Sequence, residues 1–248
     1  MEPQPQYNAI ASKESFQTIR FRLNAKEDPV RQRNYRLAAI GAVVALVGIA
    51  GCAFLDSGES PFMYQDIPVA KGSTTAGEGH SVTLKGNALP LAGPGIAVGE
   101  SLRNVTVAKG DLSLLNIADT KGKVRIISIV PSLDTAVCEQ QTHYLSEKNQ
   151  GLDQSVELIT VSVDTPFAQG RFAKKAKIDN ITFLSDFRGG LFGMAHGLLV
   201  KDPHLLARAV MVVDKNNVVR YLQVTPELAQ MPDLDAAFKA ANELAEKS

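Results

Sequence analysis

The chain has 248 residues, of which 45% are apolar and 21% charged, values that exclude a wholly disordered or fibrous protein. Lysine plus arginine and aspartate plus glutamate each total 26, so the zero formal net charge argues against a nucleic-acid-binding protein. The two cysteines, Cys52 and Cys138, are too few for a disulfide framework or a four-thiolate zinc site.

The N-terminal quarter carries its charge unevenly. Residues 1–36 hold seven basic and four acidic side chains without a sustained apolar period, so we expect a disordered, basic cytoplasmic arm. Residues 37–55 are 19 uncharged residues, a length that can just span a bilayer as a helix. Because arginines precede this stretch, we expect a single-pass anchor in the inner (cytoplasmic) membrane, with the rest of the chain outside the cytoplasm.

A cleaved lipoprotein is the alternative to this transmembrane helix. The sequence Ile49-Ala50-Gly51-Cys52 resembles a bacterial lipobox, in which the cysteine is lipidated and becomes the new N-terminus. The arm before the apolar stretch is longer than the basic region such signals carry, which favours an uncleaved anchor. Both interpretations predict a membrane-tethered domain, and the alternative places the anchor at Cys52.

Residues 56–79 have the composition of a flexible linker. They are rich in glycine, serine and threonine, and their charged side chains are mainly acidic. Residues 80–248 follow as the globular domain, which is long enough to bury a core without disulfides or metals.

The globular domain alternates predicted strands with predicted helices. A β-hairpin is expected where two short apolar runs flank Gly86-Asn87. Further strands are predicted at 124–130, 156–163, 209–213 and 218–224, and helices at about 136–149, 166–176 and 233–246. Several of these strands are apolar on both faces, as central strands of a sheet are. The pattern predicts an α/β domain with a mixed, partly parallel central sheet flanked by helices.

Cys138 lies where a predicted buried strand leads into a helix. A cysteine in the first helical turn faces unpaired backbone N–H groups and the positive end of the helix dipole, and both favour the thiolate. Thr135 lies three residues earlier, where its hydroxyl can point to the same place. The alternative is that Cys138 is a small buried hydrophobic residue, as most free cysteines are.

Arg208 stands at the start of the predicted strand 209–213. A strand that is apolar on both faces offers no solvated side for a charge, so this arginine is expected to have a partner, and a thiolate would serve. The alternative is an arginine that extends past the strand end into water.

The segment Pro131-Ser-Leu-Asp-Thr-Ala-Val-Cys138 resembles the active-site segment of peroxiredoxins, in the version of the bacterial thiol peroxidase subfamily. Further segments resemble that subfamily in the same order, namely 84–91, 164–169, 184–186 and 205–209. The likeness covers about 81–248. It implies a thioredoxin-like fold with an N-terminal β-hairpin, and a homodimer.

The resemblance also implies a thiol-dependent peroxidase that reduces hydrogen peroxide and organic hydroperoxides. Cys138 would be the peroxidatic nucleophile, and Thr135 would hydrogen-bond the peroxide. Arg208 would stabilise the thiolate and the charge on the leaving oxygen, and Pro131 would shield the thiolate from water. No metal or organic cofactor is expected.

One position departs from the subfamily pattern. Where a second, resolving cysteine would follow in an Arg-Phe-Cys setting, this chain has Ala173, and Cys52 lies in the predicted membrane segment. We therefore expect a one-cysteine cycle, in which a small thiol or a thioredoxin-like protein reduces the sulfenic acid. The alternative is a membrane-tethered redox sensor or interaction protein that uses Cys138 sulfenylation without efficient turnover.

Overall fold

The computed structural model describes residues 62–119 and 122–247. The predicted basic arm at 1–36 and the predicted membrane segment at 37–55 lie outside these residues. Within the described part, no helix combines the length and the apolar character that a membrane crossing requires.

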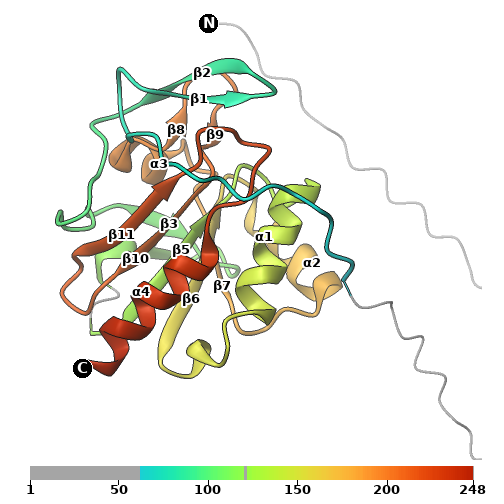
Figure 1. Ribbon diagram of the computed structural model, residues 1–248, viewed down its shortest axis with the longest axis vertical. Helices are drawn as coiled ribbons and strands as arrows, with labels where there is room; N and C mark the ends of the chain where they lie inside the picture. Colours follow the sequence, from blue (N-terminus) through green and yellow to red (C-terminus); the bar gives the residue numbers. More distant parts are fainter. Residues whose placement is uncertain (1–61, 120–121, 248) are drawn as a thin grey trace, which may run out of the picture. The chain divides into compact units, whose positions relative to one another are not determined.

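In the described residues, seven strands form the main sheet in the order β11-β10-β5-β6-β7-β3-β4 (Figure 1). Their bounds are Thr106–Ala108 for β3, Leu114–Asn116 for β4, Val124–Ile129 for β5, Val156–Ser162 for β6, Thr182–Ser185 for β7, Ala209–Val213 for β10 and Val219–Val224 for β11. β5, β6 and β7 run parallel, and the outer strands pair antiparallel. This sheet confirms the predicted mixed α/β architecture, although β3, β4 and β7 were not among the predicted strands.

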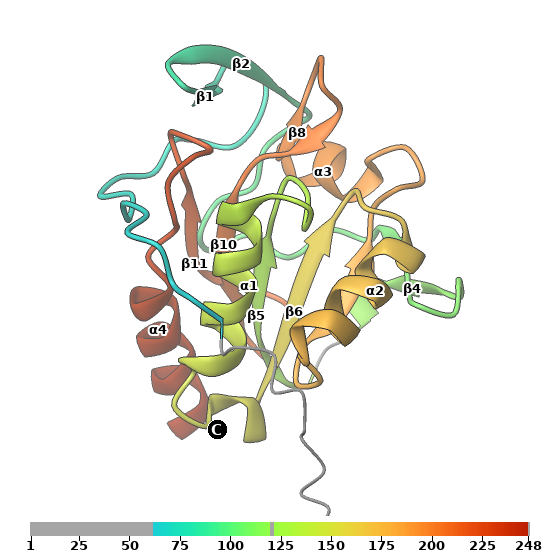
Figure 2. The ribbon, with the colours of Figure 1, turned by 90° about the vertical axis from the view of Figure 1, so that its right-hand side faces the viewer.

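Helices cover both faces of this sheet. Their bounds are Ala136–Glu147 for α1, Pro166–Ala176 for α2, Leu191–His196 for α3 and Leu234–Glu246 for α4. α1 and α2 lie in front of β5 and β6 in Figure 2, and α4 packs with α1 over one apolar cluster. The opposite face packs against α3 and a smaller sheet. Because both faces are covered, every residue of β5 is buried, as its apolar sequence predicts.

The smaller sheet contains the predicted hairpin. Its order is β1-β2-β8-β9, with bounds Ser81–Leu84, Asn87–Ala92, Leu199–Val200 and Leu205–Leu206. The turn between β1 and β2 consists of Lys85 and Gly86, whose φ angles of 51° and 83° are both positive. Such two-residue turns match the twist of a hairpin, which explains the glycine.

Residues 62–76, which we call the strap, pack along the domain. The sequence predicts a flexible linker at 56–79, of which 56–61 lie outside the described residues. The blue segment in Figure 1 runs from the hairpin past α1. Gln65 donates its backbone N–H to Gln140 Oε1 at 2.7 Å and accepts from Gln140 Nε2 at 3.0 Å. The Phe62 ring stacks on His143 with centroids 3.9 Å apart, and Ala70 donates to the Met231 carbonyl at 2.8 Å. These contacts with side chains and backbone elsewhere in the chain hold the segment, and amino-acid composition does not reveal them.

His196, at the end of α3, is a fully buried, neutral histidine. Its Nδ1 lies 2.9 Å from the Phe192 carbonyl, and its Nε2 accepts from the Arg103 backbone N–H at 3.1 Å. The second contact fixes the ring as the neutral tautomer that is protonated at Nδ1. The pKa of His196 falls from 6.5 to about 4, mainly because of burial. The hydrogen bond to the Phe192 carbonyl opposes this fall, and the charge of Arg103 contributes to it.

This buried histidine predicts acid sensitivity. The unfolded chain takes up the proton near pH 6.5, whereas the folded protein resists it until about pH 4, so stability falls as the pH drops through this window. The loss amounts to about 3 kcal/mol. Urea unfolding of wild type and His196→Gln from pH 7 to pH 4 measures it. The variant should be less stable at pH 7 but lose less stability on acidification, and parallel pH profiles would contradict the assignment.

Candidate active site

The loop between β5 and α1 is held by the end of the neighbouring strand. Asp164, which follows β6, accepts hydrogen bonds from Ser132 Oγ at 2.8 Å and from the Leu133 backbone N–H at 2.7 Å. Because β5 and β6 are parallel, their carboxyl ends lie at the same edge of the sheet. The pairing thus places the Asp164 carboxylate where it can fix the loop that precedes α1.

Cys138 is the third residue of α1 and is completely buried. Its side chain packs with Val130 and Leu133, and the rings of Phe172 and Phe183 pack against this small cluster. The prediction of a cysteine in the first helical turn is therefore confirmed. The first turn of a helix presents backbone N–H groups that have no partner within the helix, and such groups stabilise negative charge on a nearby sulfur.

Arg208 reaches the sulfur from the antiparallel neighbour of β5. It immediately precedes β10, and Ala209 of that strand pairs with Ile129, the last residue of β5. Its Nη2 lies 3.3 Å from Cys138 Sγ, its Nε donates to the Leu228 carbonyl at 2.9 Å, and only 2% of the residue is exposed. The structure thus brings together the two residues that the sequence singled out separately.

Gln141 was not predicted as part of the site. Its Oε1 accepts from Arg208 Nη1 at 2.7 Å, and its Nε2 donates to Ser128 Oγ at 2.8 Å. It lies three residues after Cys138, a spacing that puts both side chains on one face of the helix. This spacing, with an amide inside a predicted buried helix, is the signal that could have identified it.

The guanidinium of Arg208 has no carboxylate partner among the described residues. Its hydrogen bonds go to a carbonyl, an amide oxygen and the sulfur. A buried charge is stable only with a compensating partner, and Cys138 is the group in these contacts that can become an anion. The arrangement therefore places a guanidinium donor and the start of a helix at the Cys138 sulfur.

Thr135 and Pro131 lie beside this pair rather than in contact with it. Thr135 is the exposed residue before α1, and its hydroxyl donates to the Ser132 carbonyl at 3.1 Å. In the described part of the chain, the hydroxyl makes no hydrogen bond to Cys138 or Arg208, unlike the shared position that the sequence suggests. The backbone of Thr135 is extended, with φ of −133° and ψ of 144°, and its hydroxyl points to Ser132. Pro131 is buried in the same loop.

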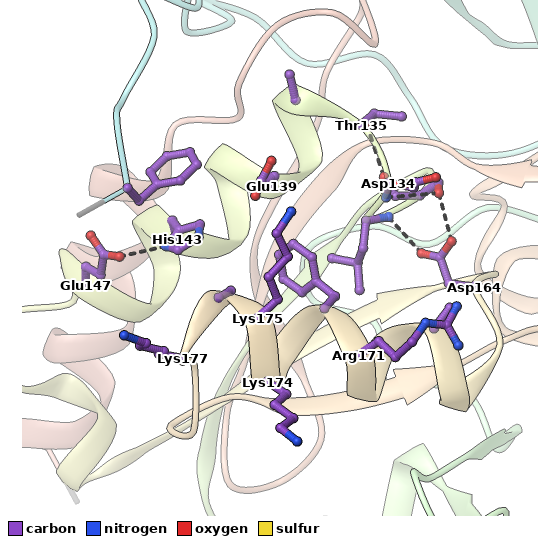
Figure 3. A pocket seen from close by; sticks show the side chains of 17 residues that line it. Asp134, Thr135, Glu139, His143, Glu147, Asp164, Arg171, Lys174, Lys175 and Lys177 are labelled. Carbon is purple, nitrogen blue, oxygen red and sulfur yellow. Dashed lines mark hydrogen bonds and ion pairs between the residues drawn. The ribbon is translucent and has the colours of Figure 1, made fainter. Parts of the chain in front are cut away.

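A groove runs between α1 and α2 next to this loop (Figure 3). It has a volume of about 1410 Å³. Asp134 and Thr135 stand at one end, and His143 and Glu147 at the other, where Phe62 of the strap also lines it. The site therefore combines a buried sulfur with an open, charged groove beside it.

Comparison with known proteins places these features in a family. The Redoxin family model matches residues 97–238. Thiol peroxidase from Halalkalibacterium halodurans is 45% identical over 161 residues, covering 65% of this chain and 96% of that protein. Thiol peroxidase from Streptococcus sanguinis is 40% identical over 162 residues, 65% of this chain and 99% of that protein. The crystal structure of a peroxiredoxin-like protein from Aquifex aeolicus matches with a TM-score of 0.64 and 36% identity, over 70% of this chain and 99% of that one.

The matched region contains the reactive sulfur, the loop before it and the arginine that contacts it. Residues 97–238 include the loop after β5, Cys138 with its helix, and Arg208 before β10. The two curated relatives are matched over almost their full lengths. The chain therefore belongs to the redoxin family, among its peroxiredoxin-type thiol peroxidases.

Proposed function

We propose that this protein reduces hydrogen peroxide and organic hydroperoxides with Cys138 as its single peroxidatic thiol. The observation that carries the proposal is the 3.3 Å contact between Arg208 Nη2 and Cys138 Sγ at the start of α1. A guanidinium and a helix N-terminus beside a sulfur support nucleophilic attack, because both stabilise the negative form of the sulfur that attacks.

The proposed reaction begins with attack of the Cys138 thiolate on one peroxide oxygen. A sulfur–oxygen bond forms, the oxygen–oxygen bond breaks, and the leaving hydroxide or alkoxide takes up a proton as water or alcohol. Cys138 becomes a sulfenic acid. Arg208 stabilises the thiolate and the charge on the leaving oxygen.

Two neighbours have supporting roles in this proposal. Thr135 releases the Ser132 carbonyl and donates its hydroxyl to the peroxide, which the backbone N–H of Cys138 also holds. Pro131, buried in the same loop, limits the access of water to the sulfur. Both roles require only local rearrangement at the start of α1.

Recycling of the sulfenic acid is proposed to depend on a thiol from outside the domain. Cys138 is the single cysteine in the described residues, and Ala173 occupies the position at which the resemblance places a resolving cysteine. A small thiol or a thioredoxin-like protein then supplies the electrons.

Stopped-flow mixing of the full chain with hydrogen peroxide, and separately with an organic hydroperoxide, tests the proposal. Oxidation of Cys138 should be much faster than oxidation of free cysteine under the same conditions. A rate no faster than that of free cysteine would contradict the peroxidase function. Fast oxidation that no added thiol reverses would instead favour the redox sensor.

We further propose that the chain forms a homodimer through an apolar surface near the site. Phe167, Phe187, Leu191 and Met194 are exposed by 41–61% although they are large and apolar. Phe167 and Phe187 follow the paired parallel strands β6 and β7, at the sheet edge where the Cys138 loop lies. Large apolar side chains that are exposed on neighbouring elements support an interface between two copies. Sedimentation should show a dimer that Phe167→Glu dissociates and Val69→Glu does not, since Val69 is an exposed control that pairs with Met231 next to α4. A monomeric wild type would refute the proposal.

Membrane attachment is proposed from the sequence of residues 37–55. The uncharged stretch and the arginines before it support a single-pass inner-membrane anchor with the catalytic domain outside the cytoplasm. Alkaline extraction of membranes should leave the full-length chain in the pellet. Intact mass decides between the two attachments, because loss of residues 1–51 would show a lipoprotein anchored at Cys52, and a freely extracted chain would exclude both.

A further inference from the structure

The groove between α1 and α2 rests on the side chains that cover the reactive sulfur. Leu133 and Phe172 line the groove and also belong to the apolar cluster around Cys138. The sulfur is fully buried beneath them. A molecule in the groove is therefore separated from Cys138 by two side chains whose rotation would open a direct path.

The walls of the groove carry opposite charges. Glu139 extends from α1, and Lys175 and Arg171 extend from α2, with Glu139 and Lys175 pointing into the space between the helices (Figure 3). In the described part of the chain, neither cation has an ion pair or a side-chain hydrogen bond. Among its described lining residues, the groove thus offers the free cations Arg171 and Lys175 on α2, together with Lys174, and the carboxylate of Glu139 on α1, above the apolar side chains of Leu133 and Phe172.

We propose that this groove binds the thiol that reduces Cys138, and that this thiol is a small zwitterionic molecule, an amino-acid or short-peptide thiol with carboxylates and an ammonium group. The carboxylates pair with Lys175 and Arg171, and the ammonium pairs with Glu139. This inference rests on the proposed peroxidase function, because it assigns the reductant of the same sulfur.

The burial of the Cys138 sulfur favours a small molecule over a protein reductant. The groove volume of about 1410 Å³ accommodates a short peptide, since typical small-molecule sites measure roughly 300–1,000 Å³. A thiol on the surface of a folded protein has to reach a sulfur that has no exposed area, whereas a bound peptide thiol lies directly on Leu133 and Phe172.

The proposed chemistry uses two equivalents of the thiol. The first attacks the sulfenic sulfur, so that a disulfide to Cys138 forms and hydroxide leaves as water after taking up the thiol proton. The second thiol attacks the sulfur of the bound molecule, which releases the Cys138 thiol and a free disulfide. Two thiols are oxidised, one sulfenic acid is reduced, and no further redox group takes part.

Pre-oxidised full-length protein mixed with reduced glutathione, a zwitterionic peptide thiol, tests the assignment, with neutral 2-mercaptoethanol as the comparison. Lys175→Glu should slow reduction of the sulfenic acid by glutathione by about tenfold or more, because an ion pair becomes a repulsion. The same variant should leave reduction by 2-mercaptoethanol within about twofold of wild type. Lys239→Glu, an equal charge change at an exposed position of α4, should leave the rate of reduction by either thiol unchanged.

Three results would overturn the assignment while leaving the peroxidase function intact. In the first, Lys175→Glu slows reduction of the sulfenic acid by glutathione and by 2-mercaptoethanol equally. In the second, Lys239→Glu slows reduction by glutathione as much as Lys175→Glu does. In the third, a thioredoxin-like protein reduces the sulfenic acid but no small thiol does. Failure of the proposed function has a separate signature, because Cys138 would then not form the sulfenic acid when peroxide is added.

Discussion

Cys138→Ser is expected to abolish peroxide reduction, leaving consumption at the level of protein-free buffer. A serine hydroxyl is far less nucleophilic than a thiolate and does not form the sulfenic acid on which the cycle depends. The serine oxygen can still accept from Arg208, so the buried guanidinium keeps a neutral partner. The measurement is the initial rate of peroxide loss in the presence of excess thiol.

The matched control is Cys52→Ser, which removes the chain's other thiol. This variant should consume peroxide at the wild-type rate, because the proposed cycle uses Cys138 alone. Urea unfolding should show that Cys138→Ser remains folded. Peroxide consumption by folded Cys138→Ser at a rate clearly above buffer would refute the assignment of the nucleophile.

Arg208→Lys should slow oxidation of Cys138 by a factor on the order of 10²–10³, as loss of a preorganised charge-stabilising donor does in other enzymes. Lysine keeps the positive charge but cannot donate to the sulfur, the Leu228 carbonyl and Gln141 Oε1 together, as Arg208 does. The buried acceptors left unpaired should also reduce the free energy of unfolding by about 1–3 kcal/mol.

Arg220→Lys provides the control for the arginine substitution. Arg220 lies on β11 with 47% of its side chain exposed, and its Nε lies 2.7 Å from Oδ2 of the largely buried Asp214. Its replacement should leave the rate of Cys138 oxidation unchanged and stability within about 1 kcal/mol. A wild-type oxidation rate in folded Arg208→Lys would show that the contact seen here does not serve catalysis.

Long apolar elements and the chemistry of the first helical turn were predictable from sequence. β5, β6, β10 and β11 are rich in β-branched residues, and the predicted helices contain α1, α2 and α4 almost residue for residue. Cys138 could be proposed because the start of a helix stabilises a thiolate, and Arg208 because a charge beside an apolar strand requires a partner.

Short elements could not be predicted, because their identity depends on partners distant in sequence. β7 has four residues and β3 three, too few for a periodic pattern, and they are strands because β7 pairs with β6 and β3 pairs with β7. The strap shows the same limitation. Its linker-like composition conceals the hydrogen bonds that Gln140 and Met231 provide from elsewhere in the chain.

The site itself was predictable as a pair of residues but not as a geometry. Sequence spacing does not reveal that the Thr135 hydroxyl turns toward Ser132, that Gln141 braces Arg208, or that Asp164 fixes the loop. The groove is likewise a product of tertiary structure, because α1 and α2 meet only after β6 has joined β5 in the sheet.

The most direct test of the single-thiol account is peptide mass spectrometry of the full chain after one equivalent of peroxide, with a sulfenic-acid trap added. The account predicts trapped sulfenic acid at Cys138, its absence at Cys52, and recovery of the free Cys138 thiol when a small thiol replaces the trap. A disulfide between Cys138 and Cys52, or oxidation confined to Cys52, would contradict it.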